Sequence, residues 1–150
     1  MTMRAIIAVA LFFLAVQQVR AQTLTECGGS DGYAYYFSGG AVPAKESGLR
    51  PDGVTGGRII LNYIDKEFDV ITKNAFGATS SVKQSGAQII PMASGDGLIG
   101  VMAAYPTGVL ETYVFQLDSR GDGAVAWTVP RTNIQVNKLS LMKAQCRGPR

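Results

Sequence analysis

Glu67 and Asp69 are the carboxylates whose spacing is best suited to catalysis. They stand two residues apart in a predicted strand, so their side chains share one face, with Cα atoms about 6.5 to 7 Å apart. Such a pair could serve two-carboxylate hydrolysis or hold a cation weakly. Phe68 and Val70 alternate with them, which is the ordinary pattern of a strand with one face in solvent. The sequence favours the solvent-facing interpretation and leaves a carboxylate-dependent hydrolase as the alternative.

Histidine is absent from the 150 residues, which limits the available chemistry further. This excludes Ser-His-Asp and Cys-His catalysis and every zinc site that needs imidazole. We therefore predict no catalytic residues, no cofactor and no metal site, and an enzyme is not the favoured class.

Three short motif matches have structural interpretations. Residues 95–100 (GDGLIG) fit G-x-G-x-x-G, but an apolar strand ended by Pro106 follows them instead of a helix, so we predict a hairpin turn. Ser140 and Lys143 fit S-x-x-K, yet residues three apart in a strand point to opposite faces. Residues 120–122 (RGD) match the tripeptide of adhesive integrin ligands, although these are also ordinary residues of a turn.

A cluster of tyrosines is the most plausible contact surface. Tyr33, Tyr35 and Tyr36 lie next to glycine-rich turns, with Phe37 after them. In a strand Tyr33, Tyr35 and Phe37 face one way and Tyr36 the other. Packing in a core or at a barrel rim is the commoner role of such residues. Tyrosine is also favoured at binding surfaces, so Tyr33, Tyr35 and Tyr36 are the candidate binding residues.

Clusters of glycine, aspartate and proline separate short runs rich in β-branched and aromatic residues, which predicts strands joined by turns. Residues 98–131 are expected to form a three-stranded antiparallel meander with a central middle strand. We find no sustained helical periodicity, although a short helical turn within residues 41–50 is compatible with the pattern. The predicted strands are 33–37, 58–63, 67–72, 80–83, 87–92, 98–105, 109–117, 124–130 and 139–145.

These strands predict an all-β fold for residues 22–150, expected to be a single domain. The candidates are an antiparallel β-barrel or a two-layer β-sandwich of about eight to nine short strands. Cys27 and Cys146 are the two cysteines of the chain, and we expect them to join its termini as a disulfide. Closing a loop of about 119 residues would stabilise the fold by roughly 4 to 5 kcal/mol. Sequential hairpins together with this clamp favour an up-and-down barrel.

Residues 1–21 have the pattern of a secretory signal peptide. Arg4 precedes an apolar run at 5–16, and small residues at Val19 and Ala21 suit a cleavage site. The run is too short to span a membrane, and no second long apolar stretch follows. Cleavage would remove two of the 14 basic residues and none of the 11 acidic ones, bringing the formal net charge from +3 to +1. We expect a periplasmic or secreted protein without a nucleic-acid partner.

The layout resembles small bacterial envelope proteins that form an eight-stranded barrel with a terminal disulfide, some of which inhibit lysozymes. This architectural resemblance implies an inhibitor-like binding role. The sequence therefore predicts an exported, non-enzymatic β-domain that binds an envelope or extracellular protein or glycan. A carboxylate-dependent hydrolase and a purely structural envelope protein are the alternatives.

Overall fold

Tight turns with positive φ angles divide the chain into strands. Asp96 and Gly97 have φ angles of 49° and 78° and link two antiparallel strands, which confirms the hairpin turn predicted for residues 95–100. Asp65 and Lys66 form a similar connection with φ angles of 51° and 68°. The computed structural model describes residues 21–132 and 135–150, so residues 1–20 of the predicted signal peptide lie outside it.

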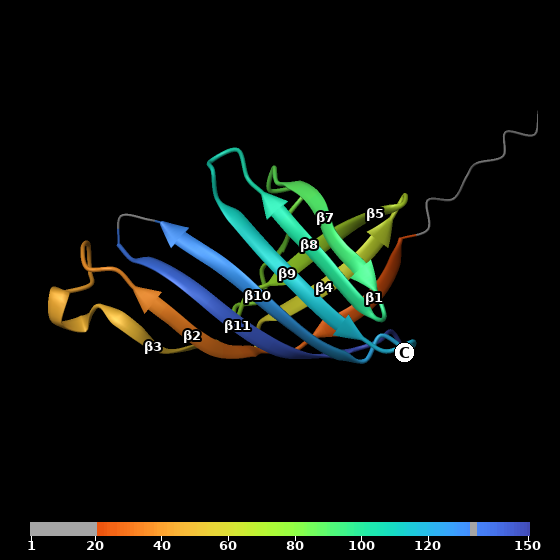
Figure 1. Ribbon diagram of the computed structural model, residues 1–150, viewed down its shortest axis with the longest axis horizontal. Helices are drawn as coiled ribbons and strands as arrows, with labels where there is room; N and C mark the ends of the chain where they lie inside the picture. The colour runs from red at the N-terminus through yellow and green to blue at the C-terminus, as the bar shows by residue number, and fades with distance from the viewer. Residues whose placement is uncertain (1–20, 133–134) are drawn as a thin grey trace, which may run out of the picture.

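The described residues form eleven strands and one 3-10 helix (Figure 1), the helix lying within the segment where a helical turn was expected. No helix in this part of the chain is long and apolar enough to cross a membrane. The elements are β1 Gln22–Cys27, β2 Ser30–Tyr36, the 3-10 helix Ala44–Glu46, β3 Gly48–Val54, β4 Arg58–Ile64, β5 Glu67–Lys73, β6 Thr79–Ser81, β7 Gln88–Gly95, β8 Leu98–Ala104, β9 Leu110–Leu117, β10 Gly123–Thr132 and β11 Asn137–Arg147.

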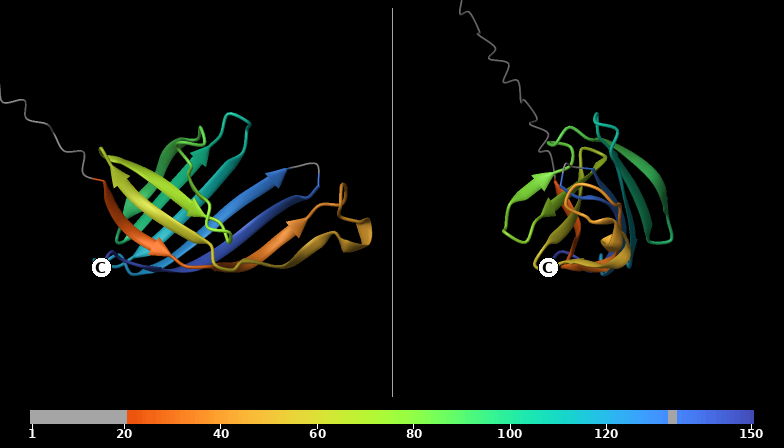
Figure 2. Two further views of the ribbon diagram at one scale, coloured as in Figure 1. Left: turned by 180° about the vertical axis from the view of Figure 1, so that it is seen from behind. Right: turned by 90° about the vertical axis from the view of Figure 1, so that its left-hand side faces the viewer.

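All strand pairs are antiparallel and belong to one sheet, with the order β6-β5-β4-β1-β11-β10-β9-β8-β7. The sheet curls so that β4 and β5 cross over β8, β9 and β10, as the front and back views show (Figures 1 and 2). The result is a half-barrel whose first and last strands are neighbours. The all-β prediction, the β8–β9–β10 meander and the central position of β9 are confirmed.

The structure has eleven strands where eight to nine were expected, because β1 and β3 were not predicted. β3 contains Pro51 among glycines, the residue types that the sequence analysis assigns to turns, but β3 pairs only with β2 and is therefore an edge strand. An edge strand tolerates proline because one side of its backbone needs no ladder partner. β1 is the mainly polar sequence QTLTEC, which lacks the apolar alternation that marks the other strands.

The sheet forks along β11, which is long enough to pair with two strands on the same edge. Its last residues pair with β1, whereas residues 138–143 pair with β2. Gly28 and Gly29 separate β1 from β2, and residues 55–57 separate β3 from β4 at the same level. The paired strands β2 and β3 therefore leave the half-barrel as an arm, which extends to the left in Figure 1.

The core fills the concave side of the half-barrel. Alternation in β9 places Tyr113, Phe115 and Leu117 inside, and in β10 Val125 and Val129 are buried with Trp127 packed against the cluster. The facing wall contributes a matching set of buried apolar side chains: Ile59, Leu61, Val70 and Val82.

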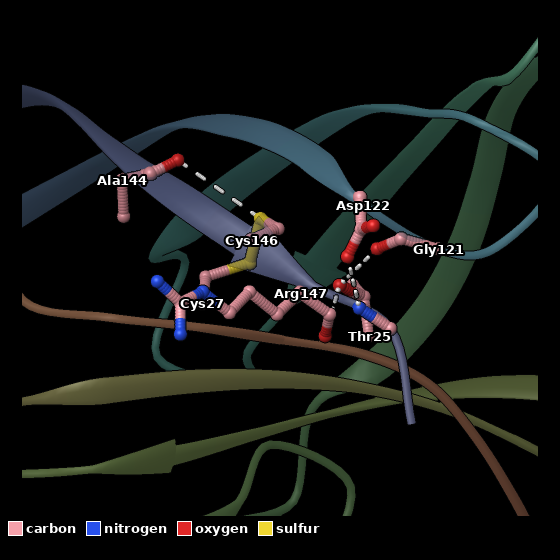
Figure 3. The surroundings of a disulfide bond; sticks show 8 residues. Thr25, Cys27, Gly121, Asp122, Ala144, Cys146 and Arg147 are labelled. Atoms are coloured by element: carbon pink, nitrogen blue, oxygen red, sulfur yellow. Dashed lines mark hydrogen bonds between the residues drawn. A yellow bond between two sulfur atoms is a disulfide. The ribbon is translucent and has the colours of Figure 1, made fainter. Parts of the chain in front are cut away.

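A disulfide closes the seam between the first and last strands. β1 meets β11 through two residue pairs, Glu26 with Arg147 and Cys27 with Cys146. The two cysteines are buried and form the predicted disulfide, with a sequence separation of 119 residues (Figure 3). With so few backbone pairs, the seam depends on this covalent bond.

Hydrogen bonds from the β9–β10 turn reinforce the seam. The buried hydroxyl of Thr25 in β1 donates to the Gly121 carbonyl at 2.7 Å, and the Gly148 backbone N–H donates to the Asp122 carboxylate at 3.0 Å. The approach is close, because a Cβ on Gly121, whose φ is 84°, would lie 2.3 Å from the Leu24 carbonyl oxygen. The turn thus holds both terminal segments.

Replacing both cysteines by alanine should lower the free energy of unfolding by about 4 to 5 kcal/mol, because the unfolded chain loses the restraint of a long closed loop. Urea denaturation of the two proteins measures this difference. Reduction of the unaltered chain should give a comparable loss. A decrease below about 1 kcal/mol in both experiments would contradict the importance assigned to the seam.

Candidate functional site

The structure separates the three candidate tyrosines. Tyr33 and Tyr35 project from the outer, convex face of β2 and are 56% and 45% exposed. Tyr36 lies on the opposite face, where the Lys138 ammonium is 5.3 Å from its ring centroid. The predicted alternation is therefore confirmed, and only Tyr33 and Tyr35 share a surface.

Neighbouring strands extend this surface with more apolar side chains. Tyr33 pairs with Leu141 of β11 and Pro51 of β3, and Tyr35 pairs with Leu139 and Leu49 of the same two strands. Phe37 follows β2, and its ring packs edge-on against Tyr35 with centroids 5.0 Å apart. We call the following six residues, which are between 45% and 68% exposed, the outer aromatic face: Tyr33, Tyr35, Phe37, Leu49, Leu139 and Leu141.

The outer aromatic face lies on the arm and on the half of β11 to which the arm pairs. Further exposed apolar side chains, Leu110 and Val114, project from the same convex side of β9, because they alternate with the buried Tyr113 and Phe115. On β9 these two apolar side chains alternate with Thr112 and Gln116, so the convex side is less uniformly apolar there than on the arm. Scattered exposed apolar residues are normal, but a contiguous group on one face is typical of an interaction site.

A largely buried ion pair beneath the arm fixes the outer aromatic face from behind. The Lys138 ammonium of β11 contacts the Asp52 carboxylate of β3, and both side chains are about five-sixths buried, at 17% and 16% exposure. The Ser140 hydroxyl donates to the same carboxylate at 3.3 Å, and Ala34 between them is fully buried. The contacts tie β3 across β2 to β11, so the three strands form one rigid platform.

The same contacts set the charge of Asp52. Burial alone would raise the pKa of Asp52, but the hydrogen bond and positive charge of Lys138, together with the Gly53 N–H and the Ser140 hydroxyl, lower the pKa below its ordinary value of 3.8. A carboxyl whose pKa is lower in the folded state stabilises that state above its ordinary pKa. This contribution is lost as the pH falls through the lowered value.

Glu67 and Asp69 each contact a side chain of β6 or of the residues that follow it. Glu67 is exposed and ion-paired with Lys83, which holds the pKa of Glu67 below its ordinary range through a hydrogen bond and its charge. Asp69 is only 7% exposed and accepts a hydrogen bond from the Ser81 hydroxyl at 2.7 Å. The solvent-face interpretation is therefore wrong for Asp69, because β6 and the residues after it cover this carboxylate. Both side chains anchor that segment to β5.

The remaining motifs occupy the structural positions expected of them. Ser140 is buried on the inner face of β11 and Lys143 is exposed on the outer face. Arg120, in the predicted turn, is ion-paired with Asp118 and Asp122 at 3.1 and 3.3 Å. Among residues 21–132 and 135–150, no group of three or more cysteine, histidine, aspartate or glutamate side chains could hold a metal ion.

Sequence reasoning missed Leu49, Leu139 and Leu141 as surface residues. For β11 a signal was present: if Cys146 faces the disulfide inside, alternation places every odd-numbered residue of the strand outside. Leu139 and Leu141 had therefore to be exposed. Leu49 had no such signal, because β3 itself was not recognised as a strand.

Comparisons with known proteins identify no relative. A scan against protein-family models, a search of curated proteins and a search of solved structures each find no match to this chain. A proposal for the function therefore rests on the contacts and surfaces of the chain itself.

Replacing Asp52 by asparagine should loosen the arm, because it leaves the largely buried Lys138 ammonium without a counter-charge. We expect backbone amides of β2 and β3 to exchange hydrogen about tenfold faster or more above pH 5, with the β8–β10 amides unchanged. Below the pKa of Asp52 the two proteins should converge. Hydrogen exchange followed by mass spectrometry measures the difference.

Asp31→Asn is the matched control, since Asp31 of β2 and Lys143 of β11 form an exposed pair at 3.8 Å within the same three-stranded platform. Exposed pairs contribute little to stability, so this variant should exchange like the unaltered chain. Equal exchange in both variants and the unaltered chain would show that the Asp52 contact does not hold the arm.

Proposed function

We propose that this chain is an exported, non-enzymatic β-domain that binds a partner protein through the outer aromatic face. The observation that carries the proposal is the exposure of six large apolar side chains on one face of a three-stranded platform. Leaving them in water forgoes the stabilisation that burial would provide, roughly 1.5 to 3 kcal/mol for each fully buried side chain. A partner surface would recover part of that free energy on binding.

The chemistry of the face favours a protein over a glycan. Leu49, Leu139, Leu141 and Phe37 offer no hydrogen-bonding groups, whereas sugars need polar side chains to match their hydroxyls. Two tyrosines among aliphatic side chains are typical of the centre of a protein–protein interface. The exposed pair Asp31 and Lys143 lies at one end of the face, where an interface has its polar rim.

The partner is expected to dock on the face of the sheet and not to add a strand to its edge. Pro51 lies in the middle of the edge strand β3, and Pro91 lies in the opposite edge strand β7, where the register with β8 also shifts. Proline lacks a backbone N–H, and prolines and bulges discourage pairing with a further strand. The remaining edge strand, β6, is only three residues long, and short edges also discourage pairing, so the outer aromatic face is left as the docking surface.

The disulfide and the N-terminal sequence both favour an oxidising compartment. The seam between β1 and β11 depends on a disulfide, and such bonds persist in the periplasm and outside the cell. Together with the signal-peptide pattern of residues 1–21, this supports a periplasmic or secreted location. We infer that the partner is an envelope or extracellular protein.

The test is cross-linking of the chain in its native compartment, followed by equilibrium binding to the purified captured protein. Tyr35→Ala and Leu141→Ala should each weaken binding by about tenfold or more, because residues at the centre of an interface contribute most of the affinity. Both side chains are exposed, so each variant should keep its stability within about 0.5 kcal/mol.

Phe76→Ala is the matched control. Phe76 is 97% exposed but lies in the connection between β5 and β6, away from the outer aromatic face, so its loss should leave binding unchanged. Equal binding by all three variants would overturn the site. Binding to glycans or to lipid vesicles that is lost in Tyr35→Ala, without a protein partner, would overturn the assignment of the partner class.

A further inference from the structure

The outward row of β11 changes from apolar to basic along the strand. Leu139 and Leu141 belong to the outer aromatic face, and the outward residues that follow them are Lys143, Gln145 and Arg147. Alternate residues of a strand point to the same side, so these five side chains form one line on the convex side of the sheet. The outer aromatic face therefore borders a polar, basic surface at the end of β11 that carries the disulfide.

A groove of about 590 Å³ lies at that basic end, beside the seam between β1 and β11. Its charged lining residues are Arg147 of β11, Glu26 of β1, Arg58 of β4 and Arg150, and the other lining residues are uncharged. The disulfide lies directly beside Arg147 (Figure 3). Pockets of about 300 to 1,000 Å³ are typical of binding sites, so the groove has room for more than a single water-sized group.

Positive charge is in excess in this groove. Glu26 and Arg147 are paired in the register of β1 and β11, but the Glu26 carboxylate forms its ion pair with Arg58, at 3.0 Å. Among residues 21–132 and 135–150, no side-chain carboxylate lies within ion-pair distance of Arg147 or Arg150. Arg150 is the last residue of the sequence, and even when a carboxylate at its backbone end is counted, three positive groups face two negative ones.

The carboxylates next to the groove already have counter-charges. Asp31 is paired with Lys143 at 3.8 Å, and Asp122 is paired with Arg120 at 3.3 Å. The Asp122 carboxylate also accepts a hydrogen bond from the Gly148 N–H. A guanidinium presents several donors in a planar fork that fits a carboxylate, so the unpaired arginines favour an acidic group from outside the chain.

One interface can cover the outer aromatic face and the groove together. Leu141 and Gln145 are four positions apart on β11, which is about 14 Å along a strand. A protein–protein interface of ordinary size buries about 800 Å² on each partner, which corresponds to a patch roughly 30 Å across. A partner protein seated on the outer aromatic face would therefore extend over the groove.

We infer that the partner protein carries acidic side chains beside its apolar contact surface, and that these carboxylates bind Arg147 and Arg150 in the groove. This inference rests on the proposed function, because the outer aromatic face supplies the main contact. Complementary charges at an interface speed association and fix orientation more than they add affinity. The apolar side chains would thus supply the affinity, and the groove would select an acidic partner and orient it.

A titration of the unaltered chain tests the groove by itself, with tetraglutamate, tetralysine and inorganic phosphate as probes. Tetraglutamate should shift the backbone amide signals of residues 145–148 in nuclear magnetic resonance, and its affinity should fall several-fold between about 50 and 200 mM salt, because exposed charges are screened. Tetralysine should leave these signals unchanged. No shift with tetraglutamate, or equal shifts with tetralysine, would overturn the inference. Tighter binding of phosphate than of tetraglutamate would also overturn it, because the groove would then be a phosphate site.

Arg147→Gln removes one of the two unpaired guanidinium groups. It should weaken tetraglutamate binding and slow association with the captured partner, each by about three- to tenfold. Arg50→Gln is the matched control, because Arg50 is an exposed arginine of β3 that does not line the groove, and its loss changes the net charge equally. Both side chains are exposed, so neither substitution should change the midpoint of urea denaturation.

The captured partner distinguishes this inference from the proposed function. If Tyr35→Ala loses binding while Arg147→Gln associates as fast as the unaltered chain, the acidic-partner inference is wrong and the proposed function stands. Equal slowing in Arg147→Gln and Arg50→Gln would also contradict the groove, since net charge alone would then account for the effect. Unchanged binding in Tyr35→Ala would overturn the proposed function, and this inference with it.

Discussion

The disulfide seam between β1 and β11 is the constraint on which the other features depend. Two residue pairs join these strands, yet through them one wall of the half-barrel is attached to the other. The covalent bond allows β1 to leave β11 after so short a contact and to continue along β4. The rest of the same edge of β11 is thereby free for β2, and the sheet can fork.

The fork gives the two sides of one sheet different environments. Where β1 and β4 curl over β8, β9 and β10, the concave face becomes a core that includes a cavity beside Glu111. Where β2 and β3 extend with β11, nothing in the described residues covers the convex face, and six large apolar side chains remain in solvent. Gly32 marks how closely the arm lies on β11, because a Cβ there would be 2.1 Å from the Leu141 carbonyl oxygen.

Local signals in the sequence were sufficient for most strands and for the disulfide. Alternation fixed the faces of β9, and positive-φ residues fixed the turns, because these depend only on near neighbours along the chain. What failed depended on tertiary context. The proline in β3 is compatible with a strand only at a sheet edge, and the carboxylate of Asp69 is buried only because residues twelve to fourteen positions later fold over it. The hydrogen bonds that Glu111 accepts from Tyr113 of β9 and from Tyr105, which follows β8, likewise depend on how these two strands pair.

The strict alternation of β11 has an evolutionary consequence. Its even-numbered residues from Ser140 to Cys146 are buried, and its odd-numbered residues from Leu139 to Arg147 are exposed. Substitutions can therefore change the outward set while the inward set is preserved, so the surface can diversify without loss of stability. An insertion or deletion of one residue within this strand would exchange the two sets and separate Cys146 from Cys27. Changes in chain length should therefore accumulate in the connections between strands, such as residues 74–78, and be purged from β11.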